Sequence, residues 1–187
     1  MVHGKKCNGL KSLPKEIGNL VNLEKLFIAN GELTSLPAEV ANLDAVTDLE
    51  IYNCSAMTDF PEVIAGMASI ESINLSNNSQ WPADEILNGV KELSSGEAAA
   101  KIQIIYLTEN NLEVLPKEVC NMKKLGLLDL SKNKIHTIEK AFGKDINPVQ
   151  MCFDYNQLSS LHTVEIDGRN IFCQTDDVES FTSKYNN

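Results

Sequence analysis

Histidines, cysteines and paired acids are the side chains here that could carry out chemistry, and they are widely spread. The histidines His3, His136 and His162 lie far apart, without the nucleophile and second base that a catalytic triad needs. The adjacent acids Asp176 and Asp177 fit a turn better than a calcium loop, and the sequence has no glycine-rich phosphate loop, HExxH or EF-hand motif. These patterns predict no enzyme, no cofactor and no metal site.

The cysteines show neither disulfide nor zinc spacing. They are Cys7, Cys54, Cys120, Cys152 and Cys173, with no CxxC pair and no histidine at zinc-ligand spacing. An odd number argues against a complete disulfide framework, so we expect free thiols that pack as small core residues.

Composition and charge exclude several classes of partner. The chain has 187 residues and is 43% hydrophobic, which fits one globular domain with a substantial core. Its 26 acidic and 16 basic residues give a formal charge of -10, which opposes binding to nucleic acid or to an anionic membrane. No apolar run reaches the roughly 18 residues of a membrane span, and none of signal-peptide length follows the first residues. We expect no nucleic-acid partner and no membrane contact by this domain.

One short apolar phrase recurs along the chain and indicates how these side chains are positioned. It has apolar residues at its positions 1, 4 and 6 and occurs at residues 23–28, 70–75, 102–107 and 125–130. The spacing is 23 residues from Leu23 to Val46 and from Ile102 to Leu125, 24 from Val46 to Ile70, and 32 from Ile70 to Ile102. Positions 4 and 6 share one face of a strand, so each phrase predicts a short strand whose apolar face is buried by stacking on its neighbours.

A second phrase, LxxLPxxI, follows the first at residues 10–17, 33–40 and 112–119, with a variant at 60–64. The whole pattern, LxxLxLxxNxLxxLPxxIxxL, resembles the leucine-rich repeat in its 23-residue form over residues 1 to about 161. The resemblance implies an α/β fold: a right-handed solenoid of about seven repeats, with parallel strands on the concave side and short helical or extended segments on the convex side. The LPxxI style also resembles that of bacterial surface or secreted repeat proteins.

Position 9 of the repeat is usually asparagine. It is Asn8, Asn78, Asn110, Asn133 and Asn156, with Gly31 and Cys54 as the departures. A buried amide group must satisfy both its donors and its acceptor. We therefore expect these side chains to bond the backbone of their own turn and of the next repeat, as structural rather than ligand-binding residues.

The repeat that starts at Ile70 is nine residues longer than its neighbours, and the extra length lies at about 81–97. Apolar residues 86, 87, 90 and 93 recur there at helical spacing, which predicts a helix that bulges from the convex side. Trp81 stands where other repeats have the leucine before proline, which predicts a core residue. The alternative is that the bulge is a second docking surface.

The pattern changes near both ends. Residues 162–177 contain Asp167-Gly168 between short apolar segments, which predicts a hairpin-like insert. Residues 178–187 resume the start of a further repeat, which we expect to be truncated. Both ends fall within a repeat, so we expect a piece of a longer protein with exposed apolar edges.

Positions 3, 5 and 7 of each strand phrase point away from the core and form the concave face. The candidate protein-binding residues on it are Phe27, Glu50, Tyr52, Asn74, Ile104, Tyr106, Leu127 and Asp129. Aromatic residues are favoured anchors at protein interfaces, although scattered surface hydrophobes need no special explanation. We predict a non-catalytic module that binds a protein partner, and the alternative is a structural spacer or adhesin stalk of a larger bacterial surface protein.

Three glycosylation sequons, which begin at Asn53, Asn74 and Asn77, bear on the setting of the protein. Sugar at these positions would obstruct the concave face, which argues against a eukaryotic secretory route. We expect a bacterial surface or secreted protein in preference to a cytoplasmic one.

Overall fold

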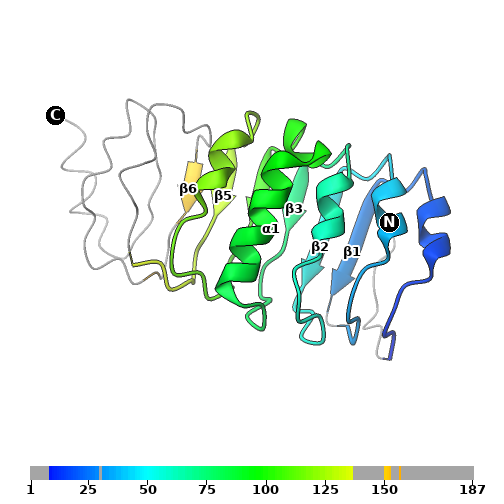
Figure 1. Ribbon diagram of the computed structural model, residues 1–187, viewed down its shortest axis with the longest axis horizontal. Coiled ribbons are helices and arrows are strands. Elements are labelled where there is room, and N and C mark those ends of the chain that lie inside the picture. Colours follow the sequence, from blue (N-terminus) through cyan, green and yellow to red (C-terminus); the bar gives the residue numbers. More distant parts are fainter. Residues whose placement is uncertain (1–8, 30, 137–149, 153–155, 157–187) are drawn as a thin grey trace.

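A computed structural model describes residues 9–29, 31–136, 150–152 and 156. One parallel sheet of six strands in sequence order forms one side of the molecule (Figure 1). The strands are β1 (Lys25–Ala29), β2 (Asp48–Tyr52), β3 (Ser72–Asn74), β4 (Ile104–Tyr106), β5 (Leu127–Asp129) and β6 (Gln150–Cys152). Each predicted strand phrase within the described residues forms one strand, so the α/β solenoid prediction is confirmed.

Short helical segments cover the opposite, convex side of the sheet. They are the 3-10 helices η1 (Lys15–Asn19), η2 (Ala38–Asn42), η3 (Glu62–Gly66), η4 (Glu97–Ala100) and η5 (Lys117–Asn121), and one α-helix, α1 (Ala83–Ser95). Proline stands directly before every one of them except η4. Proline suits this place because its φ is already fixed near the helical value and the first amide of a helix needs no partner.

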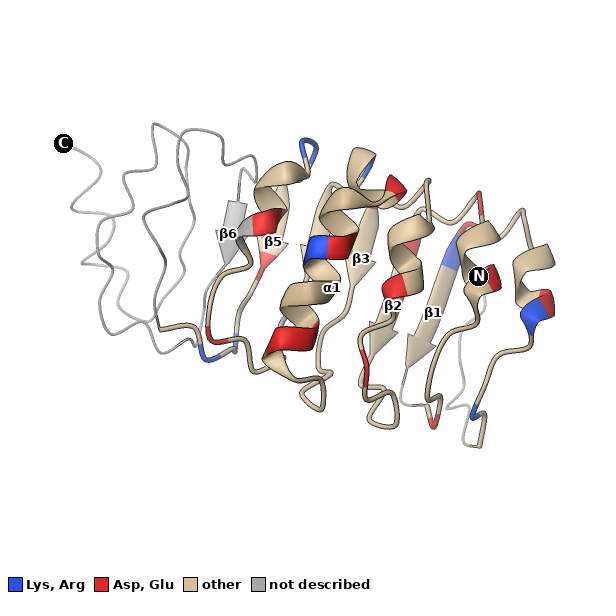
Figure 2. Cartoon of the chain, in the orientation of Figure 1, with Lys and Arg blue, Asp and Glu red and all other residues tan. Residues whose placement is uncertain are grey.

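Every helical segment also begins with an acidic residue in its first turn. Acidic residues are therefore spread along the convex side, α1 included (Figure 2). In α1, Asp84 and Glu85 lie beside the positive end of the helix dipole, where a negative charge stabilises the helix.

The strand register aligns the apolar rows of successive repeats. Position 4 pairs as Leu26↔Leu49, Leu49↔Ile73, Ile73↔Ile105 and Ile105↔Leu128. These rows and the apolar residues of the convex segments form one continuous core from Leu33 to Ile135. Since full burial of a leucine or isoleucine contributes about 1.5–3 kcal/mol, stacking supplies the stability that a single repeat cannot reach alone.

Helix α1 fills the long repeat, as the spacing of its apolar residues predicts. Its residues Ile86, Val90 and Leu93 are buried, while Leu87 is half-buried. The helix lies against η3 and η5, the helical segments of the preceding and following repeats. Gly89 sits so close to the Phe60 ring that a Cβ atom there would overlap it. The insert is thus part of the stack rather than a loop projecting from it.

Trp81 is a core residue, as its place in the repeat predicts. Its side chain is 1% exposed, and its ring packs against Phe60 with centroids 5.5 Å apart at a tilt of 56°. The indole Nε1 donates a hydrogen bond to the Met57 carbonyl oxygen at 2.7 Å. The buried indole therefore cannot anchor a partner on the surface.

The asparagines at position 9 form a ladder of hydrogen bonds inside the solenoid. The Asn78 Oδ1 accepts from the Cys54 amide at 2.9 Å, and the Asn110 Oδ1 accepts from the Asn78 amide at 2.8 Å. The Asn78 Nδ2 donates to the Ile51 and Leu75 carbonyl oxygens at 2.8 and 3.0 Å. The structural role is confirmed, but its direction is corrected: the side chains bond their own turn and the preceding repeat, because the asparagine points back along the stack.

The residue before the ladder position adopts the left-handed conformation in four described repeats. It is Asn53, Asn77, Glu109 and Lys132 in successive repeats, with φ of 52°, 57°, 58° and 55°. Asparagine tolerates this conformation, whereas other residues lose roughly 1 kcal/mol in it. Glu109 and Lys132 are linked by an ion pair of 2.6 Å, so two of these turns are joined through their side chains.

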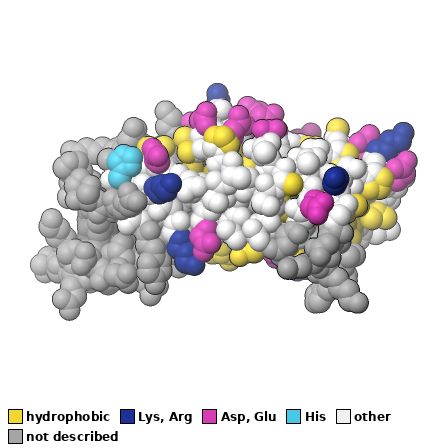
Figure 3. Space-filling view, turned by 90° about the horizontal axis from the view of Figure 1, so that it is seen from below, with side chains coloured by type: hydrophobic (Ala, Val, Ile, Leu, Met, Phe, Trp, Pro, Cys, Tyr) yellow, Lys and Arg dark blue, Asp and Glu magenta, His cyan; other side chains and the backbone are white. Residues whose placement is uncertain are grey.

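The N-terminal repeat leaves apolar side chains exposed. Leu10, Leu20 and Val21 are 42%, 49% and 50% exposed. The counterparts of Leu10 and Leu20 in the next repeat, Leu33 and Leu43, are only 2% and 1% exposed. Seen from below, hydrophobic side chains are visible at this end next to charged ones (Figure 3). This agrees with the apolar edge expected at the N-terminal end.

Several predictions fall outside the described residues. They concern the hairpin-like insert at 162–177, the repeat start at 178–187, the ladder position Asn8, and the thiols of Cys7 and Cys173. Within the described residues, Cys54 is a buried free thiol, as expected, and Cys120 is half-buried. No helix that the structure describes is long and apolar enough to cross a membrane.

Candidate functional site on the concave face

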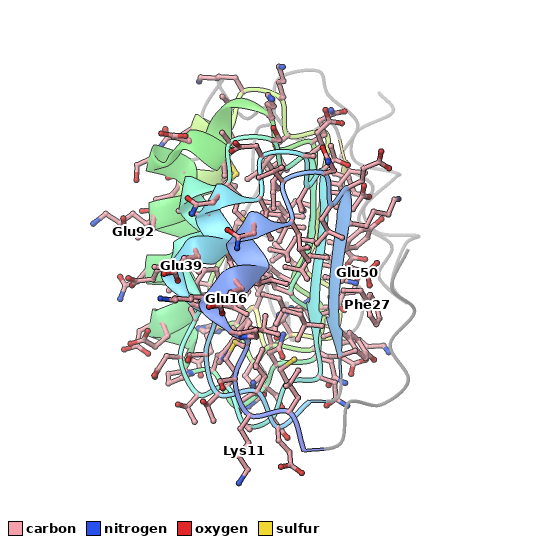
Figure 4. The ribbon with its side chains drawn as sticks, turned by 90° about the vertical axis from the view of Figure 1, so that its right-hand side faces the viewer. Lys11, Glu16, Phe27, Glu39, Glu50 and Glu92 are labelled. Atoms are coloured by element: carbon pink, nitrogen blue, oxygen red, sulfur yellow. The ribbon has the colours of Figure 1, made fainter. Side chains whose placement is uncertain are left out.

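The eight candidate residues lie on neighbouring strands of the sheet. Position 5 pairs as Phe27↔Glu50, Glu50↔Asn74, Asn74↔Tyr106 and Tyr106↔Asp129, while Ile104 pairs with Leu127 at position 3. Figure 4 shows Phe27 and Glu50 on the outer side of the sheet, opposite Glu16, Glu39 and Glu92 on the helical side. The strand faces are therefore as predicted, and the eight side chains share one surface.

Exposure divides the apolar members of this surface into two groups. Phe27 and Tyr52 on β1 and β2 are 45% and 37% exposed, whereas Ile104, Tyr106 and Leu127 on β4 and β5 are half-buried. At a strand spacing of about 4.8 Å, β1 and β5 lie about 19 Å apart, and the nearest strands of the two groups, β2 and β4, lie about 10 Å apart. We call Phe27, Tyr52 and Glu50, which is in register with Phe27, the aromatic–acid cluster.

Asn74 and Asp129 are engaged in local hydrogen bonds. The Ser76 amide donates to the Asn74 Oδ1 at 3.0 Å. The Asp129 Oδ1 accepts from the Ser131 amide at 2.9 Å and from the Ser131 hydroxyl at 2.6 Å. These bonds fix the end of the strand. The sequence carries a signal for these bonds, because the side chain of Asn or Asp commonly accepts a hydrogen bond from the backbone amide two residues later.

The charged groups of the face differ in whether they have partners. The Lys25 Nζ lies 3.4 Å from the Asp48 Oδ2, and this carboxylate also accepts a 2.8 Å bond from the Thr47 hydroxyl. By contrast, no other described residue makes a hydrogen bond or ion pair with the side chain of half-buried Glu50. Glu50 therefore presents its carboxylate beside two exposed aromatic rings.

The described residues offer little that resembles catalytic or metal chemistry. No group of three or more His, Cys, Asp or Glu side chains among them could hold a metal ion. His136 is exposed, and His3 and His162 lie outside the described residues.

Cys54 takes the ladder position in its repeat. Its Sγ lies 3.7 Å from the Ile28 carbonyl oxygen and 3.6 Å from that of Tyr52. Burial raises the pKa of its thiol, which makes Cys54 a poor nucleophile and a structural residue.

Comparison with known proteins shows which solved structures share this architecture. No family model matches the sequence. A leucine-rich repeat protein of Bacteroides thetaiotaomicron has a similar solved structure, with a TM-score of 0.68 and 29% identity, over 78% of this chain and 20% of that one. The present chain is a leucine-rich repeat protein. The predicted family is thereby confirmed, whereas the LPxxI form and the bacterial surface type stay predictions.

Two further similarities connect this leucine-rich repeat protein with larger molecules. TMV resistance protein N of Nicotiana glutinosa is 30% identical over 127 residues, which are 66% of this chain and 10% of that protein. Toll, in the structure of the Drosophila Toll–Spatzle complex, shares the fold with a TM-score of 0.60 and 19% identity, over 79% of this chain and 19% of that one. The chain thus spans about a tenth of the length of the first of these proteins.

Proposed function

We propose that this leucine-rich repeat protein is a non-catalytic module that holds a protein partner on its concave face. The observation that carries the proposal is that Phe27 is 45% exposed and Tyr52 is 37% exposed. The two side chains lie on adjacent strands and share one sheet face with polar groups. Aromatic rings bury much area and lose little conformational entropy on binding, which makes them effective anchors. The Toll–Spatzle complex supports the proposal, because there the same fold belongs to a protein in complex with another protein.

The described part of the face has room for an extended segment of the partner. Five strand spacings of about 4.8 Å make the described sheet about 24 Å wide, and its longest strands of five residues are about 16 Å long. An extended segment of about seven residues has the length to cross all six strands.

A binding experiment with two matched variants tests the proposal. The concave variant replaces Phe27, Tyr52 and Tyr106 by alanine, and the convex control replaces the exposed residues Glu62, Lys91 and Glu92 by alanine. The parent chain serves as bait, and each captured protein is then purified and titrated against all three chains. Circular dichroism melting verifies that the variants fold.

We expect the concave variant to lose at least tenfold in affinity, since truncation of an aromatic anchor typically costs more than about 1.4 kcal/mol. The convex control should bind within about twofold of the parent. Equal affinity of the concave variant and the parent would contradict the proposal and favour the helical insert as the docking surface, whereas capture of no partner would favour the spacer or stalk alternative. A setting at a bacterial surface is part of the proposal; the likeness to the Bacteroides protein supports the bacterial origin alone.

A further inference from the structure

The aromatic–acid cluster combines three features on two adjacent strands. Phe27 and Glu50 are direct neighbours across β1 and β2, about 4.8 Å apart along the sheet. Tyr52 follows Glu50 by two residues on the same face of β2, about 7 Å further along the strand. Both rings are exposed, so Glu50 has one aromatic side chain open to solvent on the adjacent strand and another on its own strand.

Glu50 differs in its bonding from the other acids in the outward positions of this face. At positions 3, 5 and 7 of β1 to β5, the charged residues are Lys25, Asp48, Glu50 and Asp129. Asp48 pairs with Lys25, and Asp129 bonds Ser131, whereas Glu50 has no partner among the described residues. These charges leave a net of -2, which comes from Asp129, whose carboxylate accepts hydrogen bonds from Ser131, and from Glu50, whose carboxylate has no described partner.

We propose that the aromatic–acid cluster binds an arginine side chain from an extended segment of the partner protein. The guanidinium lies between the rings of Phe27 and Tyr52 and donates hydrogen bonds to the Glu50 carboxylate. This inference rests on the proposed function, since it assigns the chemistry of the partner at the same face. The charge of -10 on the whole chain favours the approach of such a basic segment.

Arginine fits this cluster better than lysine for geometric reasons. Its planar guanidinium stacks on aromatic rings and presents two parallel N–H groups to one carboxylate. It is also more weakly hydrated than an ammonium group, so it loses less when it leaves water for a half-buried site. The negative faces of the two rings attract the cation further.

The test uses the full chain and a synthetic probe. The probe is a fluorescein-labelled peptide of alternating serine and arginine, about seven residues long to match the width of the sheet. Two matched peptides replace arginine by citrulline, its neutral counterpart, or by lysine. Affinity is measured by fluorescence anisotropy at low and at physiological ionic strength, for the parent and for Glu50→Gln, Phe27→Leu and Glu92→Gln.

Glu92→Gln is the charge-matched control. It removes the same single negative charge as Glu50→Gln, but from an exposed position on α1, on the opposite side of the molecule (Figure 4). We expect Glu50→Gln to weaken binding of the arginine peptide about tenfold, since hydrogen bonds between charged groups are worth more than about 1.4 kcal/mol. Phe27→Leu should weaken it about threefold, and Glu92→Gln by less than twofold.

The outcomes separate this inference from the proposed function. Equal losses in Glu50→Gln and Glu92→Gln, or no binding above that of the citrulline peptide, would overturn the inference and leave only general attraction to an acidic protein. Equal affinity for the lysine peptide would overturn the assignment to arginine. If a captured partner needs Phe27, Tyr52 and Tyr106 but is indifferent to Glu50→Gln, the inference fails while the proposed function stands. If capture is independent of the concave face but the arginine peptide behaves as expected, the proposed function fails alone.

Discussion

Replacement of Asn133 by alanine should remove the most heavily used side chain of the asparagine ladder. Asn133 is 5% exposed, and its Oδ1 accepts hydrogen bonds from the Asn110 and Leu112 amides at 3.0 Å each. Its Nδ2 donates to the Leu107 and Leu130 carbonyl oxygens at 2.8 Å each. Alanine supplies none of these groups, and the bonds are buried, so water cannot readily replace them.

The loss of stability depends mainly on the Asn110 and Leu112 amides, which lose their hydrogen-bond acceptor. A buried N–H group without an acceptor costs about 1–3 kcal/mol, so Asn133→Ala should lower the free energy of unfolding by roughly 4 kcal/mol. Asn78→Ala should cost about half as much, because among the described contacts only the Cys54 amide loses its acceptor. A domain of this kind is stable by about 5–15 kcal/mol, so the Asn133 variant should be marginal.

Urea unfolding, followed by circular dichroism and by Trp81 fluorescence, measures this difference. Coincident transitions of the two probes are needed, because stacked repeats can unfold in parts. Asn121→Ala is the control, since Asn121 is an exposed asparagine at the end of η5 and surface changes usually stay within about 0.5 kcal/mol. A loss for Asn133→Ala no larger than that for Asn121→Ala would refute the reasoning, as would an equal loss for Asn78→Ala.

Three further predictions concern the core beside the insert. Gly89→Ala should lower the urea midpoint, because the new methyl group overlaps the Phe60 ring, which is 4% exposed. The overlap costs about 1–3 kcal/mol, which is more than alanine gains in helix propensity. A higher midpoint would show that the ring can move. Trp81→Phe should lower the free energy of unfolding by about 2 kcal/mol in the same assay, since the 2.7 Å hydrogen bond to the Met57 carbonyl and part of the buried ring are lost. An unchanged urea midpoint would contradict this prediction. Burial raises the pKa of Cys54, so its contribution to stability should be complete below the unfolded thiol pKa of about 8.5 and lost as pH rises through the folded value. Urea midpoints between about pH 8 and 10 should fall more steeply for the parent than for Cys54→Ser, and equal slopes would speak against it.

The candidate site was predictable from the sequence in its location but not in its bonding. Alternation along each strand assigned Phe27, Glu50 and Tyr106 to one face, and the register agrees. Asn74 and Asp129 were assigned correctly to the same face, but their hydrogen bonds to Ser76 and Ser131 were not predicted. Alternation shows the direction of a side chain, whereas a hydrogen bond also depends on the local turn geometry.

The sequence by itself determined the repeat, the strand faces and the buried rows. It could do so because a period of about 23 residues and the two-residue alternation of a strand are local properties, and burial follows once repeats stack. Only the tertiary structure decided that Asp48 pairs with Lys25 while Glu50 stays without a described partner, and that the asparagines bond backward along the stack. These outcomes depend on distances of a few ångströms between repeats, where a small displacement makes or breaks a hydrogen bond.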